Sequence, residues 1–345
     1  MERIAVLGAG SWGTALSITL ANKGHSVRLW SRDEENIKKI NSERENKKYL
    51  KGCHIPENIM ASSNIEYVLD NPNLVVVSVP SHAVREVIRK IAPYLNDVVI
   101  VNTAKGFEPE TKKRLSVAIK EELPDQMREN VVVLSGPSHA EEVGLGMPTT
   151  VVSASENREA AEYVQDVFIS YSFRVYTNPD ILGVELAGAL KNVIALAAGV
   201  SDGLGFGDNT KAALMTRGIA EIARLGVAMG ANTMTFAGLA GIGDLIVTCT
   251  SMHSRNRRAG IQLGEGKELS DVLGHMGMVV EGVKTTKVAY RLSQEYNVEM
   301  PITEQVYKVL FEEESPKQGV SNLMGRVKTK EVEEVAQHHS DWKVK

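Results

Sequence analysis

The sequence predicts an α/β protein in which a doubly wound N-terminal sheet is followed by an all-helical C-terminal domain. The first half alternates short, continuously apolar runs with segments of helical spacing, as expected of parallel strands buried on both faces. The second half has long helical windows and few β-branched runs. A length of 345 residues also exceeds one ordinary core and favours two domains.

Seven apolar runs are predicted to be strands of one sheet. Five form its centre and two extend it: residues 3–7, 27–30, 74–79, 98–103 and 131–134, then 149–153 and 173–176. Residues 83–95 carry an apolar stripe of helical spacing, with Ser81 as the expected N-cap. The pattern changes at Asn178-Pro179, so the predicted domains are residues 1–179 and 180–345.

The composition limits the classes of partner and compartment. With a formal net charge of −4, the chain lacks the basic balance of a nucleic-acid-binding protein. Cys53 and Cys249 fit neither a disulfide framework nor a metal or redox pair, which favours a reducing compartment. The longest apolar segment, residues 181–200, contains Glu185 and Lys191 and is not expected to enter a membrane. No basic leader with an apolar core opens the chain, so we expect a cytoplasmic protein.

A glycine-rich turn follows the first predicted strand and opens a helix. Gly8, Gly10 and Gly13 have the G-x-G-x-x-G spacing of a Rossmann-type dinucleotide-binding turn. The first glycine allows the tight turn, the second lets a pyrophosphate approach the backbone, and the third allows close packing of helix and sheet. The backbone N–H groups of Ser11 and Trp12 are the expected phosphate donors.

The end of the second predicted strand indicates which dinucleotide is preferred. Ser31 and Arg32 stand where an acidic residue would bind the ribose hydroxyls of NAD, and a hydroxyl with a guanidinium suits a 2′-phosphate. We therefore expect a preference for NADP(H), with NAD(H) as the alternative cofactor. Asp33 follows at once, so a register shift of one residue would reverse this preference. Arg32 and Asp33 could also simply begin a solvated helix.

The loops after the later strands are candidate ligand sites, because open α/β sheets bind ligands at the carboxyl ends of their strands. Lys105 lies in one such loop beside Gly106 and is expected to face the cofactor; a surface lysine is the alternative. Ser138 and Glu141 have the spacing of a capping box, which predicts that Ser138 caps the next helix. Backbone N–H groups around Gly136 and Ser138 could also hold a ligand oxygen.

Lys191 stands within the long apolar segment of the second domain. On a helix, three of the four neighbours at spacings of three and four residues would be alanine or glycine, so the ammonium is surrounded by space. Partial burial would lower its pKa toward a range useful for proton transfer. We interpret Lys191 as an active-site lysine with Asn192 beside it; the alternative is a lysine that reaches solvent at a helix edge.

Further along, Asp244 lies in a glycine-rich apolar run and needs a cation, for which Lys191 is the best candidate. Ser254 is a predicted N-cap followed by Arg255, a combination that makes an anion site from helix N–H groups and a guanidinium. Of the three arginines in this segment, we expect only Arg255 to turn inward. A solvated basic face is the alternative.

Eight short motifs occur in order along the chain. They are GAGSWGTAL, SGPSHAEEV, FRVYTNPD, GALKNVIALAAG, GDLIVTCTS, SRNRR, MVVEG and EMPITE. Together they are highly specific, and through them the chain resembles the bacterial NAD(P)-dependent sn-glycerol-3-phosphate dehydrogenases nearly from end to end. The resemblance implies reversible reduction of dihydroxyacetone phosphate to sn-glycerol 3-phosphate for glycerophospholipid synthesis. It also implies a Rossmann domain, a helical substrate domain and a homodimer.

The resemblance also implies roles for individual residues. Lys191 would be the general acid/base at the C2 oxygen, with Lys105 and Asp244 close to it and Thr248 as a helper. The substrate would further be bound by Asn192, Ser254, Arg255 and Asn256 at its phosphate, and lined by Gly136 and Ser138. The dinucleotide would contact Ser11, Trp12, Ser31, Arg32, Lys105, Ala140, Arg255, Val279 and Glu281.

Two other functions remain open on the residues alone. A β-hydroxyacid or phosphogluconate-type dehydrogenase also joins a Rossmann domain to a helical domain with a catalytic lysine. A catalytically silent NADP-binding sensor would keep the glycine-rich turn without the chemistry. The eight histidines show no metal-ligand spacing, so we expect no metal.

Overall fold

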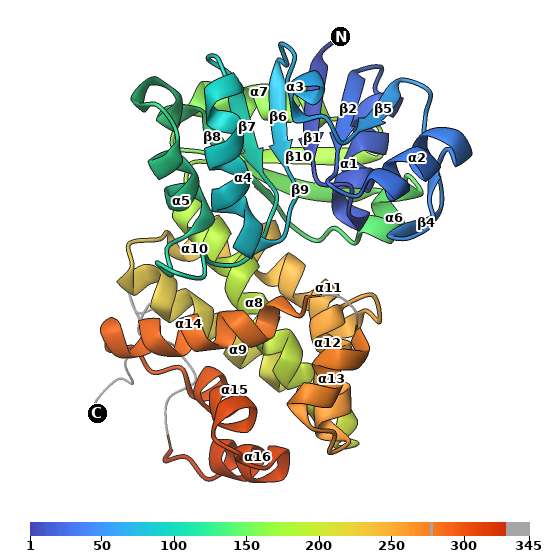
Figure 1. Cartoon of the computed structure of the whole chain (residues 1–345). Helices are drawn as coiled ribbons and strands as arrows, with labels where there is room; N and C mark the ends of the chain where they lie inside the picture. The colour runs from blue at the N-terminus through green and yellow to red at the C-terminus, as the bar shows by residue number, and fades with distance from the viewer. Residues whose placement is uncertain (277–278, 329–345) are drawn as a thin grey trace. The chain divides into compact units, whose positions relative to one another are not determined.

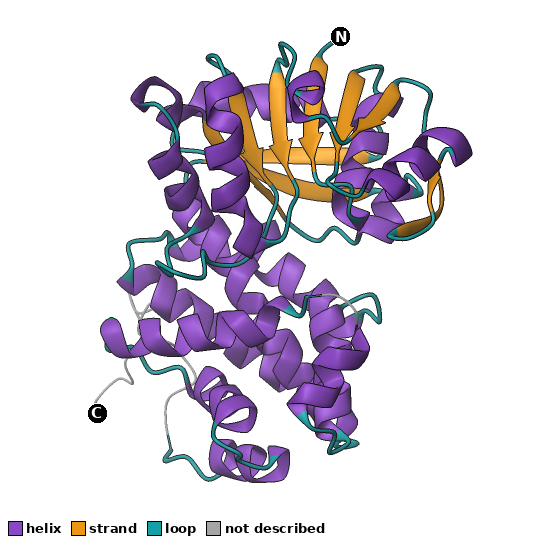
Figure 2. Cartoon of the chain, viewed as in Figure 1, coloured by secondary structure: helices purple, strands orange, loops and turns teal. Residues whose placement is uncertain are grey.

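The computed structural model describes residues 1–276 and 279–328 (Figures 1 and 2). The chain divides into two compact units, Met1–Glu185 and a second that begins at Leu186. Met278 of the MVVEG motif and residues 329–345 of the predicted second domain lie outside the described residues.

The first unit is built on an eight-stranded sheet in the order β10-β9-β8-β7-β6-β1-β2-β5. All neighbouring strands are parallel except β8 and β9. Its strands are β1 (Arg3–Leu7), β2 (Ser26–Trp30), β5 (Ile59–Ser62), β6 (Leu74–Val77), β7 (Val99–Asn102), β8 (Val131–Ser135), β9 (Thr149–Ala154) and β10 (Phe173–Asn178). A separate antiparallel pair consists of β3 (Glu45–Asn46) and β4 (Leu50–His54).

Helices of the first unit lie on both faces of this sheet (Figure 2). They are α1 (Ser11–Asn22), α2 (Glu34–Glu43), α3 (Ile65–Val68), η1 (Ser81–Ala83), α4 (Val84–Ile91), η2 (Ala92–Tyr94), α5 (Leu115–Glu122), η3 (Asp125–Asn130), α6 (Ala140–Gly144) and α7 (Arg158–Phe168). Strand β1 shows why both faces are covered. Its residues Ile4 and Val6 belong to one apolar core, and Ala5 and Leu7 belong to the other. The predicted doubly wound sheet is confirmed.

All seven predicted strands are present in this sheet, and the differences lie in short elements. β5 and the β3–β4 pair were not predicted, because β5 alternates over only four positions, β3 has two polar residues and β4 exposes three of its five residues. The expectation that Ser81 caps the helix at 83–95 is wrong. Ser81 begins the 3₁₀ turn η1, Ala83 is the N-cap of α4 without a side-chain bond, and the α-helix ends before Pro93.

The described part of the second unit contains helices and no strand, which confirms the predicted all-helical domain. Its elements are α8 (Ile181–Gly203), α9 (Asp208–Ala228), α10 (Thr233–Phe236), the π-turn η4 (Leu239–Gly243), α11 (Asp244–Thr250), α12 (Arg255–Gly264), α13 (Leu269–Met276), α14 (Glu281–Glu295), α15 (Pro301–Phe311) and α16 (Pro316–Met324). Helix α8 begins in the first unit and continues into the second, where it is the central apolar helix.

Among the described residues, two helical segments are long and apolar enough to cross a membrane by length and composition, Ile181–Gly203 and Thr233–Thr250. The first is 94% buried within the protein over its most apolar window, as a core helix is. The second is 44% buried and is interrupted at Gly241, where ψ is −105°. Neither therefore carries weight as a membrane segment.

Helices α8 and α12 approach each other so closely that their facing residues must be glycine. A Cβ atom on Gly199 would lie 2.1 Å from a backbone carbonyl oxygen of α12, and one on Gly260 would lie 2.2 Å from a carbonyl oxygen of α8. Gly203 and Gly264 repeat this contact one turn further along, at 2.2 and 2.4 Å. Close approach of the two backbones fixes which residues of α12 meet α8 in the candidate site.

Candidate active site

The turn between β1 and α1 has the geometry of a phosphate-binding turn. Gly8 has φ of +117°, and a Cβ on it would lie 2.5 Å from the carbonyl oxygen of Ser78, just after β6. A Cβ on Gly13 would lie 1.9 Å from the carbonyl oxygen of Gly8. Gly10, by contrast, faces open space. Two glycines thus close the turn at the point where strand order reverses, and the third leaves room for a pyrophosphate at the helix N-terminus.

Of the three residues after β2, Ser31, Arg32 and Asp33, the structure engages Ser31 and Asp33 in local hydrogen bonds and leaves Arg32 exposed. The Asp33 carboxylate caps α2 by accepting from the N–H of Asn36 at 3.0 Å, and it pairs with Lys48 at 2.7 Å. The hydrogen bond from Lys48 lowers the pKa of Asp33. Ser31 accepts from the Asp33 N–H at 3.2 Å, and Arg32 is exposed. Asp33 is therefore committed to starting the helix.

The loops after β7 and β8 meet at one carbonyl group. The Lys105 ammonium donates to the carbonyl oxygen of Gly136 at 3.1 Å, and the Ser138 hydroxyl donates to the same oxygen at 2.9 Å. Buried Asn102 holds the strand end before Lys105 by bonding both backbone groups of Ala104. The fold thus brings Lys105, Gly136 and Ser138 together.

The predicted capping box at Ser138 is wrong. His139 is the N-cap of α6 and makes no side-chain cap bond, and the Ser138 hydroxyl is engaged with Gly136 instead. The helix begins at Ala140, which is buried, one residue later than the motif implied. A capping box depends on the backbone angles of its first residue, which the motif alone does not determine.

In the second unit Lys191 is buried in the middle of α8, with 6% of its surface exposed. Its ammonium donates to Asp244 Oδ1 at 2.5 Å and to Thr248 Oγ1 at 2.6 Å. The Thr248 hydroxyl in turn donates to the Asp244 carbonyl oxygen at 2.6 Å. The predicted pairing of Lys191 with Asp244 is confirmed. A buried cation is tolerated here because a carboxylate and a hydroxyl replace its hydration.

The π-turn η4 explains how Asp244 reaches Lys191. At Gly241 the backbone turns so tightly that a Cβ would lie 2.1 Å from the carbonyl oxygen of Phe236. Helix α11 then begins at Asp244, and Thr248 follows one turn later on the same face. Burial raises the pKa of the neighbouring Cys249 thiol to about 12, so this thiol stays protonated beside the ion pair.

A chain of amide groups joins three helices next to this pair. Asn256 on α12 donates to Asn192 Oδ1 at 2.8 Å and accepts from the backbone N–H of Gly282 at 2.9 Å. Both side chains are buried. Gly282 lies in the first turn of α14, directly after Glu281 and close to Val279. Two residues implied by resemblance alone therefore lie at the helix start that Asn256 binds.

Ser254 caps α12, as predicted, by accepting from the N–H of Arg257 at 3.2 Å. The expectation that Arg255 is the inward-turning arginine is wrong. Arg255 is exposed, whereas Arg257 pairs with Asp202 of α8 at 2.7 Å and donates to the Thr250 carbonyl oxygen. Gly260 packs against α8 and so fixes which side of α12 faces that helix. Because each residue advances by about 100° around a helix, Arg257, three residues before Gly260, lies on the same side.

Sequence reasoning did not identify Asp202, Lys211 and Gly282, three residues that hold these helices together. Asp202 binds both Arg257 and Lys211, and Gly282 leaves no room for a side chain, since its Cβ would lie 2.7 Å from the Asn192 carbonyl oxygen. The glycine spacing in GVSDG and AGIQLG, four residues apart in each helix, was the available signal of close packing.

These features define the class of protein. The first unit has a dinucleotide-binding turn at the switch point of a doubly wound sheet, and the second has a buried lysine paired with a carboxylate. This combination is the architecture of a dinucleotide-dependent dehydrogenase.

Comparison with known proteins gives the family. Residues 3–161 match the NAD-dependent glycerol-3-phosphate dehydrogenase N-terminus, and residues 180–321 match the C-terminus of the same enzymes. The chain belongs to the NAD-dependent glycerol-3-phosphate dehydrogenase family. It is thus an oxidoreductase that uses NAD(P).

Individual relatives agree over nearly the full length. The glycerol-3-phosphate dehydrogenase [NAD(P)+] of Geobacillus thermodenitrificans is 59% identical over 97% of this chain and 98% of its own. That of Bacillus velezensis is 56% identical, with 97% of each chain covered. The crystal structure of glycerol-3-phosphate dehydrogenase from Coxiella burnetii superposes with a TM-score of 0.88 at 39% identity, covering 94% of this chain and 99% of that one.

Proposed function

We propose that the chain reduces dihydroxyacetone phosphate reversibly to sn-glycerol 3-phosphate, with NADPH as the preferred and NADH as the alternative reductant. The proposal includes a cytoplasmic homodimer that supplies glycerophospholipid synthesis. Residues 1–179 would bind the dinucleotide, and residues 180–345 would bind the substrate and carry the proton-transfer lysine. The buried contact of Lys191 with Asp244 and Thr248 is the observation that carries this assignment.

The chemistry assigned to the chain is proton transfer and charge stabilisation. When bound, the reduced nicotinamide supplies the hydride to C2 of the ketone. The Lys191 ammonium donates its proton to the C2 oxygen as negative charge develops there, and Lys105 stabilises that charge. Asp244 and Thr248 accept hydrogen bonds from the Lys191 ammonium and so fix its direction. In the oxidising direction neutral Lys191 takes the proton back.

The start of α12 is the proposed phosphate site. Ser254 uses its side chain as the helix cap, and the exposed guanidinium of Arg255 stands at the first helical position. Asn256 and Asn192 provide amide groups held in place by each other and by Gly282. Such a helix N-terminus with a guanidinium favours a dianion.

The remaining assignments follow the family pattern. Gly136 and Ser138 would line the substrate site, and the dinucleotide would contact Gly8, Gly10, Ser11, Trp12, Gly13, Ser31, Arg32, Lys105, Ala140, Arg255, Val279 and Glu281. No cluster of three or more His, Cys, Asp or Glu side chains suited to a metal ion occurs among the described residues. We propose chemistry without a metal.

Steady-state oxidation of NADPH with dihydroxyacetone phosphate tests the function. Lys191→Ala is expected to lower kcat by about 10²–10⁴-fold, because a positioned proton donor contributes that much. The matched control is Lys284→Ala, which removes an exposed lysine of α14 and should leave kcat unchanged. Near wild-type turnover of Lys191→Ala would contradict the assignment. Tight NADPH binding by the wild type without turnover of the ketone would instead indicate a sensor.

The cofactor preference is tested separately at Arg32. Because Asp33 is held by its helix and Lys48, we expect Arg32 and Ser31 to meet the ribose 2′ position. Arg32→Ala should raise the KM for NADPH about 10-fold, the worth of one exposed charge-assisted contact, and leave the KM for NADH unchanged. Equal changes for both cofactors would show that Arg32 does not bind the 2′-phosphate.

A further inference from the structure

Asp202 on α8 binds two cations with its two carboxylate oxygens. Its Oδ2 accepts from Nε and Nη2 of Arg257 on α12, at 2.8 and 2.7 Å, and its Oδ1 lies 2.8 Å from the Lys211 ammonium on α9. The three side chains are only 13–15% exposed. One carboxylate is therefore shared by a guanidinium and an ammonium in a place where water screens their charges weakly.

Arg257 carries this contact from α8 to the end of a third helix. Its Nη1 donates at 2.7 Å to the carbonyl oxygen of Thr250, the last residue of α11. Its backbone N–H donates at 3.2 Å to Oγ of Ser254, the N-cap of α12. Arg257 thus joins the end of α11 to the start of α12, where Arg255 and Asn256 of the proposed phosphate site follow Ser254.

Lys191 and Asp202 lie on the same side of α8. They stand about three turns apart, and at about 100° per residue their directions around the helix differ by about 20°. Lys191 binds Asp244 at the start of α11, and Asp202 is linked through Arg257 to its end. One side of α8 therefore holds both ends of α11 and, with them, the start of α12.

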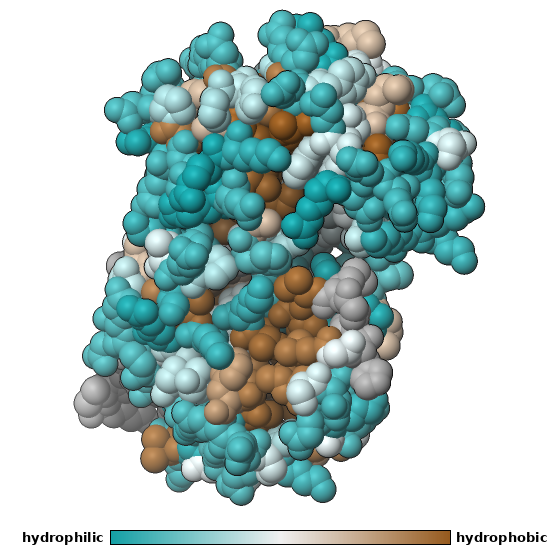
Figure 3. Space-filling model, in the orientation of Figure 1, coloured by the Kyte–Doolittle hydropathy of each residue, from teal (hydrophilic) through white to brown (hydrophobic). Residues whose placement is uncertain are grey.

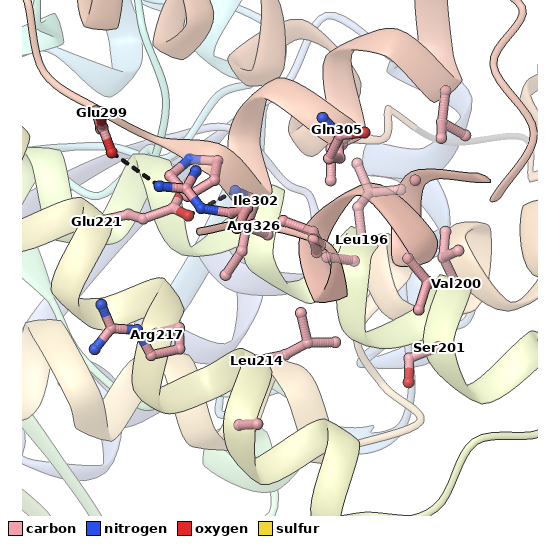
Figure 4. A pocket seen from close by; sticks show the side chains of 18 of the residues that line it. Leu196, Val200, Ser201, Leu214, Arg217, Glu221, Glu299, Ile302, Gln305 and Arg326 are labelled. Carbon is pink, nitrogen blue, oxygen red and sulfur yellow. Dashed lines mark hydrogen bonds and ion pairs between the residues drawn. The ribbon is translucent and has the colours of Figure 1, made fainter. Parts of the chain in front are cut away.

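The other side of α8 has a different environment. Leu196 and Val200 line a cavity of about 980 Å³ together with residues of α9, α15 and α16 (Figure 4). A space-filling view shows apolar surface gathered on one face of the second unit, over α8 and its neighbours (Figure 3). Val200 projects about 160° away from Asp202 around the helix. A substitution at Val200 therefore disturbs the same helix without touching the ion pair.

We propose that Asp202 is a positioning residue for the substrate phosphate and acts through Arg257. The inference rests on the proposed reduction of dihydroxyacetone phosphate. By holding the start of α12, the contact between Asp202 and Arg257 sets the separation between Lys191 and the phosphate residues Arg255 and Asn256. Only one carbon and one oxygen lie between C2 and the phosphorus of this substrate, so it is too short to follow a displaced helix.

Asp202→Asn tests this role in steady-state kinetics. An amide has a single acceptor oxygen, so either Arg257 or Lys211 would face its N–H groups. We expect the KM for dihydroxyacetone phosphate to rise about 10-fold and kcat to change less than about 2-fold, because phosphate contacts bind the ketone and its transition state alike. The KM for NADPH should stay unchanged.

Three control variants separate positioning from stability. Lys211→Met removes the other cation of Asp202 and leaves Arg257 bound, and Val200→Ala removes apolar contacts on the other side of α8. Both should lower the free energy of unfolding without changing the KM for dihydroxyacetone phosphate. Asp208→Asn breaks an exposed pair with Lys211, at 3.8 Å, and should change neither quantity. A KM that rises in Lys211→Met and Val200→Ala as it does in Asp202→Asn would show that it follows stability, and would contradict the proposal.

Arg257→Lys tests the link directly. A lysine keeps the charge, but its ammonium cannot bind Asp202 and the Thr250 carbonyl group as the guanidinium fork does. We expect a KM for dihydroxyacetone phosphate about 10-fold above that of the wild type, and no further rise in the double variant with Asp202→Asn, because both act through one contact. Multiplied effects in the double variant would overturn the proposal.

The wild type distinguishes this role from the proposed reaction. A wild type that does not reduce dihydroxyacetone phosphate would contradict the proposed function, and the positioning role with it. An active wild type whose KM for this substrate is unchanged by Asp202→Asn would overturn the positioning role alone.

Discussion

The carboxyl group of Glu221 shows how a single buried residue sets a pH dependence. It lies on α9 and accepts from the N–H of Ile302 at 2.6 Å and from the N–H and hydroxyl of Thr303 at 3.2 Å, so it caps α15. Burial nevertheless dominates and raises its pKa from an ordinary value of 4.5 to about 7. The folded chain therefore keeps this proton over a pH range in which the unfolded chain releases it.

The raised pKa of Glu221 makes the folded chain less stable at higher pH. The contribution of Glu221 to stability is fully present below pH 4.5 and is lost as the pH rises through about 7, a change of about 3 kcal/mol. Glu221→Gln keeps an acceptor for the Ile302 N–H and removes the titration. We expect the free energy of unfolding of the wild type, relative to the variant, to fall between pH 5 and pH 8.

Denaturant unfolding of both chains at pH 5, 6.5 and 8 measures this difference. Subtracting the variant removes the contribution of every other titrating group that the substitution leaves unchanged. A difference that stays constant with pH, or that grows as the pH rises, would show that Glu221 is ionised in the folded chain throughout.

Single residues of the site differed in how far the sequence could predict them. Asp244 could be paired with Lys191, because an isolated carboxylate and an isolated ammonium in apolar segments each need a partner. The inward arginine could not be chosen, because Arg255 and Arg257 differ by two helix positions and only the contact with α8 decides which one is buried. The Ser138 capping box failed because the same hydroxyl bonds the Gly136 carbonyl group.

At the scale of elements, the contact of α8 with α12 positions the proposed phosphate site. Gly260 lies one turn after Asn256 on α12, and its Cα lies against α8. A Cβ at Gly260 would lie 2.2 Å from the Leu196 carbonyl oxygen, and a backbone atom cannot move aside as a side chain can. Any larger residue must therefore push the two helices apart and move Asn256 away from Asn192.

Gly260→Ala is accordingly expected to lower the free energy of unfolding by about 1–3 kcal/mol and to raise the KM for dihydroxyacetone phosphate. The KM for NADPH should change little. The control is Gly274→Ala on α13, where a Cβ would meet nothing within 4 Å, so helix propensity alone should make it neutral or slightly stabilising. Unfolding and steady-state kinetics of both variants separate the outcomes. A destabilised Gly260→Ala with an unchanged substrate KM would show that Asn256 does not depend on this contact.

The same scale shows which elements a sequence can predict. Strand β6 is buried along its whole length and β1 along all but its first residue, so their apolar runs are unbroken over four positions. β4 exposes three of its five residues and β5 alternates over only four, so neither pattern stands out from a loop. Helix ends were less predictable than helices, because caps such as Ala83 and His139 use no side chain at all.

At the scale of the whole molecule, the chain passes from one compact unit to the other inside a helix. The first unit ends at Glu185 and the second begins at Leu186, both within α8. From the sequence, the domain boundary was predicted at Asn178-Pro179, where the pattern of apolar residues changes. That pattern cannot show that the helix after the boundary begins within the first unit. The side chain of Glu185 attaches the start of α8 to the rest of the first unit. Its carboxylate accepts from the Ser116 N–H at 2.8 Å, the Ser116 hydroxyl at 2.5 Å and Arg114 at 2.8 Å.

Removing this carboxylate should affect the stability of the whole chain. Glu185 is 9% exposed, so Glu185→Ala leaves the Ser116 N–H without an acceptor and the Arg114 guanidinium without its carboxylate in a poorly solvated place. We expect a loss of about 3 kcal/mol in the free energy of unfolding, as for other broken buried ion pairs. Glu185→Gln, which keeps one acceptor oxygen, should lose less. Glu162→Ala breaks an exposed pair with Arg158 on α7 and should cost at most about 1 kcal/mol.

Denaturant unfolding followed by far-ultraviolet circular dichroism measures these three variants. Helix α8 is also the core helix of the second unit, so its first turns cannot unfold alone without cost. If the Glu185 contacts stabilise both units, Glu185→Ala therefore lowers the midpoint of the entire unfolding transition. A transition that splits, so that only one unit loses stability, would show that α8 unfolds in two independent parts. Equal losses for Glu185→Ala and Glu162→Ala would mean that burial adds nothing to the Glu185 contact.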